Sequence, residues 1–207
     1  TTDAGTLRFA GTCGEYDAST ITWKRDGTEI AADVVTPRRF LASGQSIGSP
    51  LFDAPLLADK PAWSPVDDRV LYYDGSYGQK GINLTTGGGG RGTLVVHDES
   101  ALWVAAAWLP DGSGFVYTHD NSLSHHDLAT GQSVLLLHLP GEILLDPSVS
   151  PDGRYCYVTH LLSNFELVPT HVEFGWMSMN VLSVLDVQQR KVVNTVGLDE
   201  SYLAAGN

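Results

Sequence analysis

The chain has little cysteine and little positive charge, and each shortage argues against a class of protein. Its 207 residues include two cysteines, and Cys13 and Cys156 show no C-x-x-C spacing. Neither a disulfide framework nor a structural zinc site is therefore indicated. The 12 Lys and Arg residues stand against 24 Asp and Glu, which gives a formal net charge of −12. A field of that sign repels phosphate backbones, so we expect no nucleic-acid partner.

Long apolar runs are also missing. The longest candidate, Ala101 to Leu109, ends at Pro110 and Asp111. It falls well short of the ~20 apolar residues that cross a bilayer, so we expect a protein that is not membrane-spanning. The hydrophobic content of 43% is nevertheless enough to build a packed core. No phosphate-binding or haem-attachment spacing occurs, and we expect no cofactor.

What the chain does contain is a recurring Trp-x-x-Asp-Gly pattern. Its leading positions are Trp23, Trp63, Trp108 and Val149, at intervals of 40, 45 and 41 residues. Four-stranded propeller blades repeat at roughly 40 to 45 residues. A second marker runs in phase, because the Leu-Ala-Ser-Gly-Gln sequence that ends at position 45 nearly recurs as Leu-Ala-Thr-Gly-Gln ending at position 132.

The segments between these markers have the pattern of short strands. Runs such as 69–73, 114–118 and 154–158 are rich in β-branched and aromatic residues and lie next to Asp-Gly or similar turn signals. Asp-Gly and Thr-Gly tolerate the positive φ of tight hairpin turns. The sequence therefore predicts an all-β fold, a β-propeller of four-stranded antiparallel blades, with about four full blades in this chain.

The repeat also predicts how the chain is organised. We interpret 1–207 as a single partial propeller that belongs to a larger one. The expected blades, in order, are 19–58, 59–103, 104–145 and 146–201, with a leading outer strand at 5–12 and a trailing inner strand from 202. An open array of blades has exposed strand edges and faces, so something else must cover them.

Three copies of the repeat carry a more specific resemblance. Pro61-Ala-Trp-Ser-Pro65, Ala107-Trp-Leu-Pro-Asp-Gly112 and Pro147-Ser-Val-Ser-Pro-Asp-Gly153 resemble the repeat of TolB-like, WD-repeat-like β-propellers. Lys24-Arg25 depart from the Ser-Pro of that pattern, and Asp67-Asp68 interrupt its Asp-Gly. The resemblance implies a propeller scaffold and favours a periplasmic or extracellular location. The expected structural anchors are Trp23, Trp63, Trp108, Asp111, Gly112, Asp152 and Gly153.

One insertion breaks the repeat and supplies the best candidate for a binding site. From Gly131 to the matching turn near Arg190 the chain runs about 59 residues instead of 44, and the excess lies between Leu161 and Met179. Large apolar side chains on such a loop are typical of contact surfaces. The alternative is that the loop folds back over its own blade. The candidate binding residues are Phe165, His171, Phe174, Trp176 and Met177.

Candidates for metal chemistry are weaker. His119, His125 and His126 cluster near two aspartates and could ligate a transition metal if they came together. His125 and His126 point to opposite faces of a strand, so polar strand residues or solvent-facing imidazoles explain them better. The turn aspartates, Asp111 and Asp152 among them, are expected to accept hydrogen bonds from their own turns.

These observations favour a non-catalytic scaffold or binding module that mediates protein interaction or assembly. The expected partner is another protein or further blades of the same propeller. One alternative is the substrate-gating propeller of a prolyl-oligopeptidase-like serine peptidase, whose catalytic domain needs a G-x-S-x-G elbow. The match at Gly44 to Gly48 follows a hairpin turn with no helix behind it, which is the wrong context. A weaker alternative is a metal-dependent lyase or sugar-binding propeller.

Overall fold

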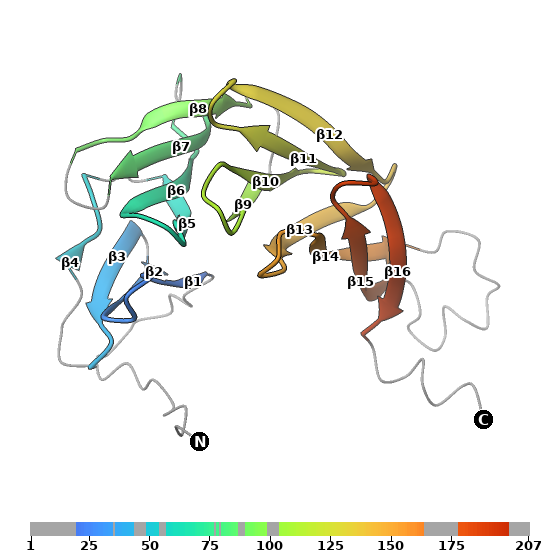
Figure 1. Ribbon diagram of the computed structural model, residues 1–207, viewed down its shortest axis with the longest axis horizontal. Coiled ribbons are helices and arrows are strands. Elements are labelled where there is room, and N and C mark those ends of the chain that lie inside the picture. Colours follow the sequence, from blue (N-terminus) through green and yellow to red (C-terminus); the bar gives the residue numbers. More distant parts are fainter. Residues whose placement is uncertain are drawn as a thin grey trace. The chain divides into compact units, whose positions relative to one another are not determined.

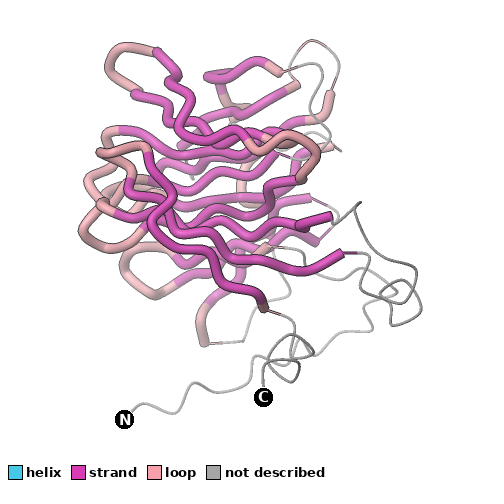
Figure 2. The backbone as a smooth tube through the Cα atoms, turned by 90° about the vertical axis from the view of Figure 1, so that its right-hand side faces the viewer, coloured by secondary structure: helices cyan, strands magenta, loops and turns pink. Residues whose placement is uncertain are grey.

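The described part of the protein consists of strands and turns. The computed structural model describes residues 20–34, 36–43, 49–53, 57–76, 78, 80–86, 90–98, 104–163 and 178–198. No helix occurs among these residues (Figure 2), so none is long and apolar enough to cross a membrane. The chain divides into two compact units, Thr1–His97 and Asp98–Asn207. Each unit holds two four-stranded antiparallel sheets, which we call blades (Figure 1).

The first unit contains the first and second blades. In each, the strands follow one another in chain order and neighbours pair antiparallel. The first blade consists of β1 (Ile21–Trp23), β2 (Glu29–Val34), β3 (Thr36–Leu41) and β4 (Ser49–Pro50). The second consists of β5 (Ala58–Trp63), β6 (Arg69–Asp74), β7 (Gly81–Thr86) and β8 (Thr93–His97).

The second unit contains the third and fourth blades, with the same strand order. The third blade consists of β9 (Val104–Trp108), β10 (Gly114–His119), β11 (Ser122–Asp127) and β12 (Gln132–His138). The fourth consists of β13 (Ile143–Val149), β14 (Tyr155–Ser163), β15 (Ser178–Asp186) and β16 (Lys191–Gly197). Four blades of this kind confirm the predicted all-β propeller fold.

Every blade has its repeat anchor at one register position. The first strand ends at the leading residue of the repeat, which lies opposite the residue seven positions later: Trp23 opposite Ile30, Trp63 opposite Val70, Trp108 opposite Phe115 and Val149 opposite Cys156. The repeat seen in the sequence is therefore one hairpin, built four times. This shared register makes positions in different blades directly comparable.

The turn of this hairpin explains the Asp-Gly pair. Asp111 Oδ1 accepts a hydrogen bond of 3.0 Å from the Ser113 backbone N–H, and Asp152 does the same for Arg154. The glycine after each aspartate has φ of 69° in Gly112 and 72° in Gly153, which an L side chain rarely adopts. These bonds confirm that the turn aspartates serve their own turns. Hydrogen bonds from the Ser113 and Ser150 hydroxyls, and secondly those from the backbone N–H groups, hold the pKa of Asp111 and Asp152 below the ordinary value.

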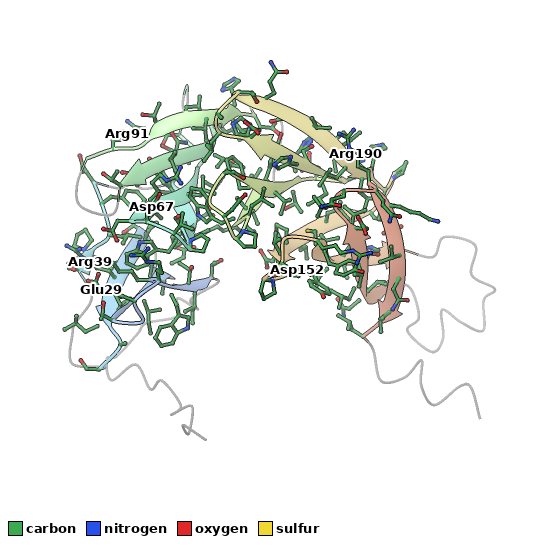
Figure 3. The ribbon with its side chains drawn as sticks, in the orientation of Figure 1. Glu29, Arg39, Asp67, Arg91, Asp152 and Arg190 are labelled. Carbon is green, nitrogen blue, oxygen red and sulfur yellow. The ribbon has the colours of Figure 1, made fainter. Side chains whose placement is uncertain are left out.

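The second blade closes the same hairpin with a shifted aspartate and without a positive-φ residue at this position. Asp67 stands where the other copies have glycine, and its Oδ1 accepts from the Arg69 backbone N–H at 3.0 Å. The Ser64 hydroxyl accepts from the backbone N–H groups of Val66 and Asp67. The interruption noted in the sequence thus moves the capping carboxylate by one residue. Asp67 and Asp152 are both labelled in Figure 3.

The blades of the first unit pack face to face. We call the face that carries the anchor the leading face and the opposite one the trailing face. Directly opposed residues share a face and successive residues alternate. β1, β2 and β3 of the first blade contact β5 of the second. The core between them combines trailing-face residues of the first blade with leading-face residues of the second: Ala31, Leu51 and Phe52 with Ala58, Trp63, Val70 and Tyr72.

The second unit repeats this arrangement. The trailing face of the third blade packs on the leading face of the fourth, where β13 contacts β9, β10 and β11. The buried cluster there consists of Val116, Leu123 and Leu136 from the third blade and Leu144, Cys156, Val158 and Leu185 from the fourth. Both units therefore use one rule, in which the trailing face of a blade receives the leading face of the next.

Candidate interaction surface

The anchor tryptophans of the first and second blades have opposite environments. Trp63 is 5% exposed, because it packs against the trailing face of the first blade. Trp23 holds the same register position in its own blade, yet it is 54% exposed. Ile21, two residues earlier on the same face, is 53% exposed. Along β1 the leading face of the first blade thus presents large apolar side chains that no described strand covers. Ile30 and Ala32, which lie opposite them on β2, are 2% and 0% exposed.

Residues of the first blade surround the buried anchor Trp63. Its backbone N–H donates to the Thr22 hydroxyl of the first blade at 3.2 Å. Lys24 Nζ lies 5.9 Å from the centroid of the Trp63 ring and 3.8 Å from an Asp68 carboxylate oxygen. Arg25 donates to the Val66 carbonyl at 2.6 Å. The Lys24-Arg25 departure from Ser-Pro therefore links one blade to the next.

The trailing face of the fourth blade is the second uncovered face. In the third blade, Val116, Thr118 and Leu123 are 0%, 1% and 0% exposed. By register, the equivalent positions in the fourth blade are Tyr157, Thr159 and Leu182, all only partly buried. Along β14 buried and partly buried residues alternate from Tyr155 to Leu161, as expected for a sheet with one covered face.

A cavity borders this second face at Thr159 and reaches His160, whose side chain belongs to the covered face. Its volume is about 380 Å³, within the roughly 300 to 1,000 Å³ of ligand pockets. The described part of its lining consists of Leu145, Thr159, His160, Asn180 and Leu198. The equivalent threonine of the third blade, Thr118, is 1% exposed, so this position is open only in the fourth blade.

A chain of polar groups runs beneath the cavity. The carboxylate of Glu142, just before β13, contacts Nδ1 of His160 on β14. Nε2 of His160 shares a hydrogen bond of 2.9 Å with the Ser183 hydroxyl on β15, which lies 3.2 Å from that of Thr195 on β16. The chain connects β14, β15 and β16 and the residue that precedes β13 through side chains, so it supports their register beyond the backbone ladder.

Glu142, His160 and Ser183 are linked in the order of a serine-hydrolase triad. A nucleophile must reach its substrate, however, and Ser183 is 2% exposed with its hydroxyl also next to Thr195. Cys156, another potential nucleophile, is fully buried, and burial raises the pKa of its thiol to about 12. These buried groups fit a structural network better than a catalytic one.

Two of the three histidines considered as metal ligands, His119 and His126, have separate partners. His119 Nδ1 lies 3.3 Å from an Asp98 carboxylate oxygen, and His126 Nδ1 shares a 2.9 Å hydrogen bond with Ser133. His126 is buried and His125 only partly so, as expected for neighbours on opposite faces of β11. Burial lowers the pKa of His126. No group of three potential ligands occurs among the residues that the structure describes.

The register also relates three ionisable residues that the sequence analysis did not connect, and it adds Asp74 and His160 to the His119 already considered. Asp74, His119 and His160 occupy one equivalent position near the end of the second strand. Each has a partner of potentially opposite charge: Arg91 at 3.1 Å from Asp74, Asp98 for His119 and Glu142 for His160. The signal was present in the sequence, because these residues are 45 and 41 positions apart, the intervals between the last three anchors.

The aromatic insertion lies outside the described residues. Its candidate binding residues, Phe165, His171, Phe174, Trp176 and Met177, therefore stay a prediction. The expected strands at 5–12 and from 202 also lie outside.

The blades, anchors and faces together define a β-propeller, and solved TolB structures share its fold. A putative TolB from Agrobacterium tumefaciens has a TM-score of 0.67 at 20% identity, covering 86% of this chain and 61% of that one. TolB from Acinetobacter baumannii has a TM-score of 0.60 at 16% identity, covering 86% and 43%. These similarities agree with the resemblance seen in the repeats and concern the fold.

Other comparisons define the limits of that similarity. The tricorn protease structure has a TM-score of 0.60 at 16% identity, and the match covers 84% of this chain but 16% of the protease chain. No protein-family model and no curated protein matches the chain. The chain spans less than two thirds of the length of either TolB structure.

Proposed function

We propose that this chain is a non-catalytic propeller module that binds protein through its uncovered blade faces. The observation that carries the proposal is the contrast between Trp63, at 5% exposure, and Trp23, at 54%. Both occupy one register position, and only Trp63 has a described neighbouring blade on its face. Large exposed aromatic side chains such as Trp23 are the usual anchors of protein interfaces.

The trailing face of the fourth blade supports the same function. Tyr157, Thr159 and Leu182 are partly exposed where their third-blade equivalents are almost completely buried. The binding partner is a protein or a set of further propeller blades that covers these two faces.

The peptidase alternative is less well supported. The tricorn similarity covers a small part of that protease and concerns the fold alone. We expect a fluorophosphonate probe, which labels activated serines, to leave the chain unmodified because Ser183 is buried. Labelling of Ser183 would contradict the non-catalytic assignment, and Ser183→Ala is the control that identifies the labelled residue.

The test of binding uses a photo-crosslinking amino acid at position 23, with the same group at position 135 as a matched control. Leu135 is 55% exposed on β12, so the two positions differ little in accessibility. We expect position 23 to give one crosslinked protein, at a defined contact mapped by mass spectrometry, and position 135 to give none. The same mixture of products from both positions, or none from either, would overturn binding through this face.

A further inference from the structure

The two uncovered faces are the two halves of one repeating interface. Within each unit, a trailing face receives the leading face of the next blade. The leading face of the first blade is exposed along β1, at Ile21 and Trp23, while Ile30 and Ala32 on β2 of the same face are buried. The fourth blade has an uncovered trailing face around Tyr157 and Thr159. The chain thus presents both a surface of the kind that inserts an anchor and one of the kind that receives it.

We propose that two copies of this chain associate head to tail, with the leading face of the first blade of one copy packed on the trailing face of the fourth blade of the other. The inference rests on the proposed function and names its partner as a second copy. We name a second copy as the partner because each copy carries both surfaces of the contact. The contact would repeat an interface that already occurs once in each unit. Such an interface is heterologous, since different surfaces meet.

The residues on the two faces are chemically suited to this contact. The leading face offers Ile21 and Trp23, which are the most exposed apolar side chains of β1. The trailing face offers Tyr157 and Leu182, and Val196, opposite Leu182 on β16, is 43% exposed. Apolar and aromatic surfaces on both sides give the hydrophobic driving force that an interface core requires.

Charge opposes the association and gives it a recognisable signature. Each copy carries a formal net charge of −12, so two copies repel one another over long range. Added salt screens this repulsion without weakening the apolar contact. We therefore expect the association to strengthen as ionic strength rises. A contact formed by salt bridges would weaken instead, and that result would overturn the proposed faces.

The deciding experiment measures the mass of the purified chain by light scattering after size-exclusion chromatography, over a wide range of concentrations. We expect the mass to rise above the 22.3 kDa of one copy as concentration increases. Trp23→Arg and Tyr157→Arg should each abolish the increase, and Leu135→Arg on β12 should not. All three changes make the net charge less negative, so a loss of association cannot come from added repulsion.

Mixing the two defective variants tests the direction of the contact. Trp23→Arg retains its trailing face and Tyr157→Arg retains its leading face, so together they should form a complex of one copy of each. Circular dichroism of each variant verifies that it is folded. If the mixture stays monomeric while the wild type associates, the contact is not head to tail and the inference is wrong.

The outcome also separates this inference from the proposed function. A wild-type chain that stays at 22.3 kDa at every concentration overturns self-association. Crosslinking from position 23 to a different protein would then leave the proposed function in place. If the chain neither associates with itself nor crosslinks to a protein from position 23, both the self-association and the proposed function are wrong.

Discussion

The first and second blades have the same anchor residue but different environments for it. Trp23 and Trp63 end the first strand of their blades, opposite Ile30 and Val70. Their exposed fractions nevertheless differ by a factor of about ten, 54% against 5%. The repeat determines where an anchor stands, whereas the neighbouring blade determines whether it is buried. One equivalent position can therefore serve the core in one blade and a surface in another.

The largest effect expected from this comparison is on stability. Trp63→Ala removes a buried indole and should destabilise the protein by about 3 to 5 kcal/mol. Trp23→Ala should cost at most about 1 kcal/mol, because that side chain is already half in solvent. Urea unfolding of both variants beside the wild type measures the difference. Equal losses would mean that Trp23 is a core residue and that its face is not free.

The contact between these two blades also contains a like-charge pair. Burial, together with the nearby Asp33 carboxylate of the first blade, raises the pKa of Asp59 from 3.8 to about 6. The unfolded chain releases this proton near pH 4 and the folded chain near pH 6. Stability therefore falls as pH rises through that window and stays reduced above it.

Removing this charge should have an effect of intermediate size on stability. Asp59→Asn should stabilise the protein by about 2 kcal/mol at pH 7 and have little effect below pH 4. Asp33→Asn, the matched variant in the first blade, should give part of that gain by lowering the pKa of Asp59. Thermal unfolding measured from pH 4 to pH 8 tests both variants. A gain that does not change with pH would contradict the assignment to Asp59.

The smallest effect is expected at a turn that occurs in the same form in the third and the fourth blade. Gly131 and Arg190 hold the same position, four residues after Asp127 and Asp186, with φ of 67° and 52°. A side chain in this left-handed conformation costs about 1 to 2 kcal/mol, and glycine in the unfolded chain offsets part of the relief. Arg190→Gly should therefore stabilise by about 0.5 kcal/mol in urea unfolding, and Gly131→Ala should destabilise by about 1 kcal/mol.

Much of the fold was predictable from the sequence. The four anchors, the strand after each Asp-Gly turn and the later turn at Arg190 are all in the places that the repeat indicated. They were predictable because each depends on a local requirement: a turn residue that tolerates positive φ, or a pleated surface that suits β-branched and aromatic side chains.

The candidate site was less predictable, because burial depends on neighbours in space. Trp23 and Trp63 are indistinguishable as sequence anchors, and only the packing of the blades separates them. The chain from Glu142 through His160 to Ser183 joins residues up to 41 positions apart, whose pairing follows from strand register. Comparing positions at the repeat interval would have related His119 to His160, which grouping histidines by proximity in sequence did not.

The buried thiol of Cys156 can report how often the third and fourth blades separate. The side chain is fully enclosed in the core that these blades share. An alkylating reagent reaches it only during moments when the two sheets part, so the rate of modification counts those openings. A partner bound to the trailing face of the fourth blade would lower the rate of modification without contacting the sulfur.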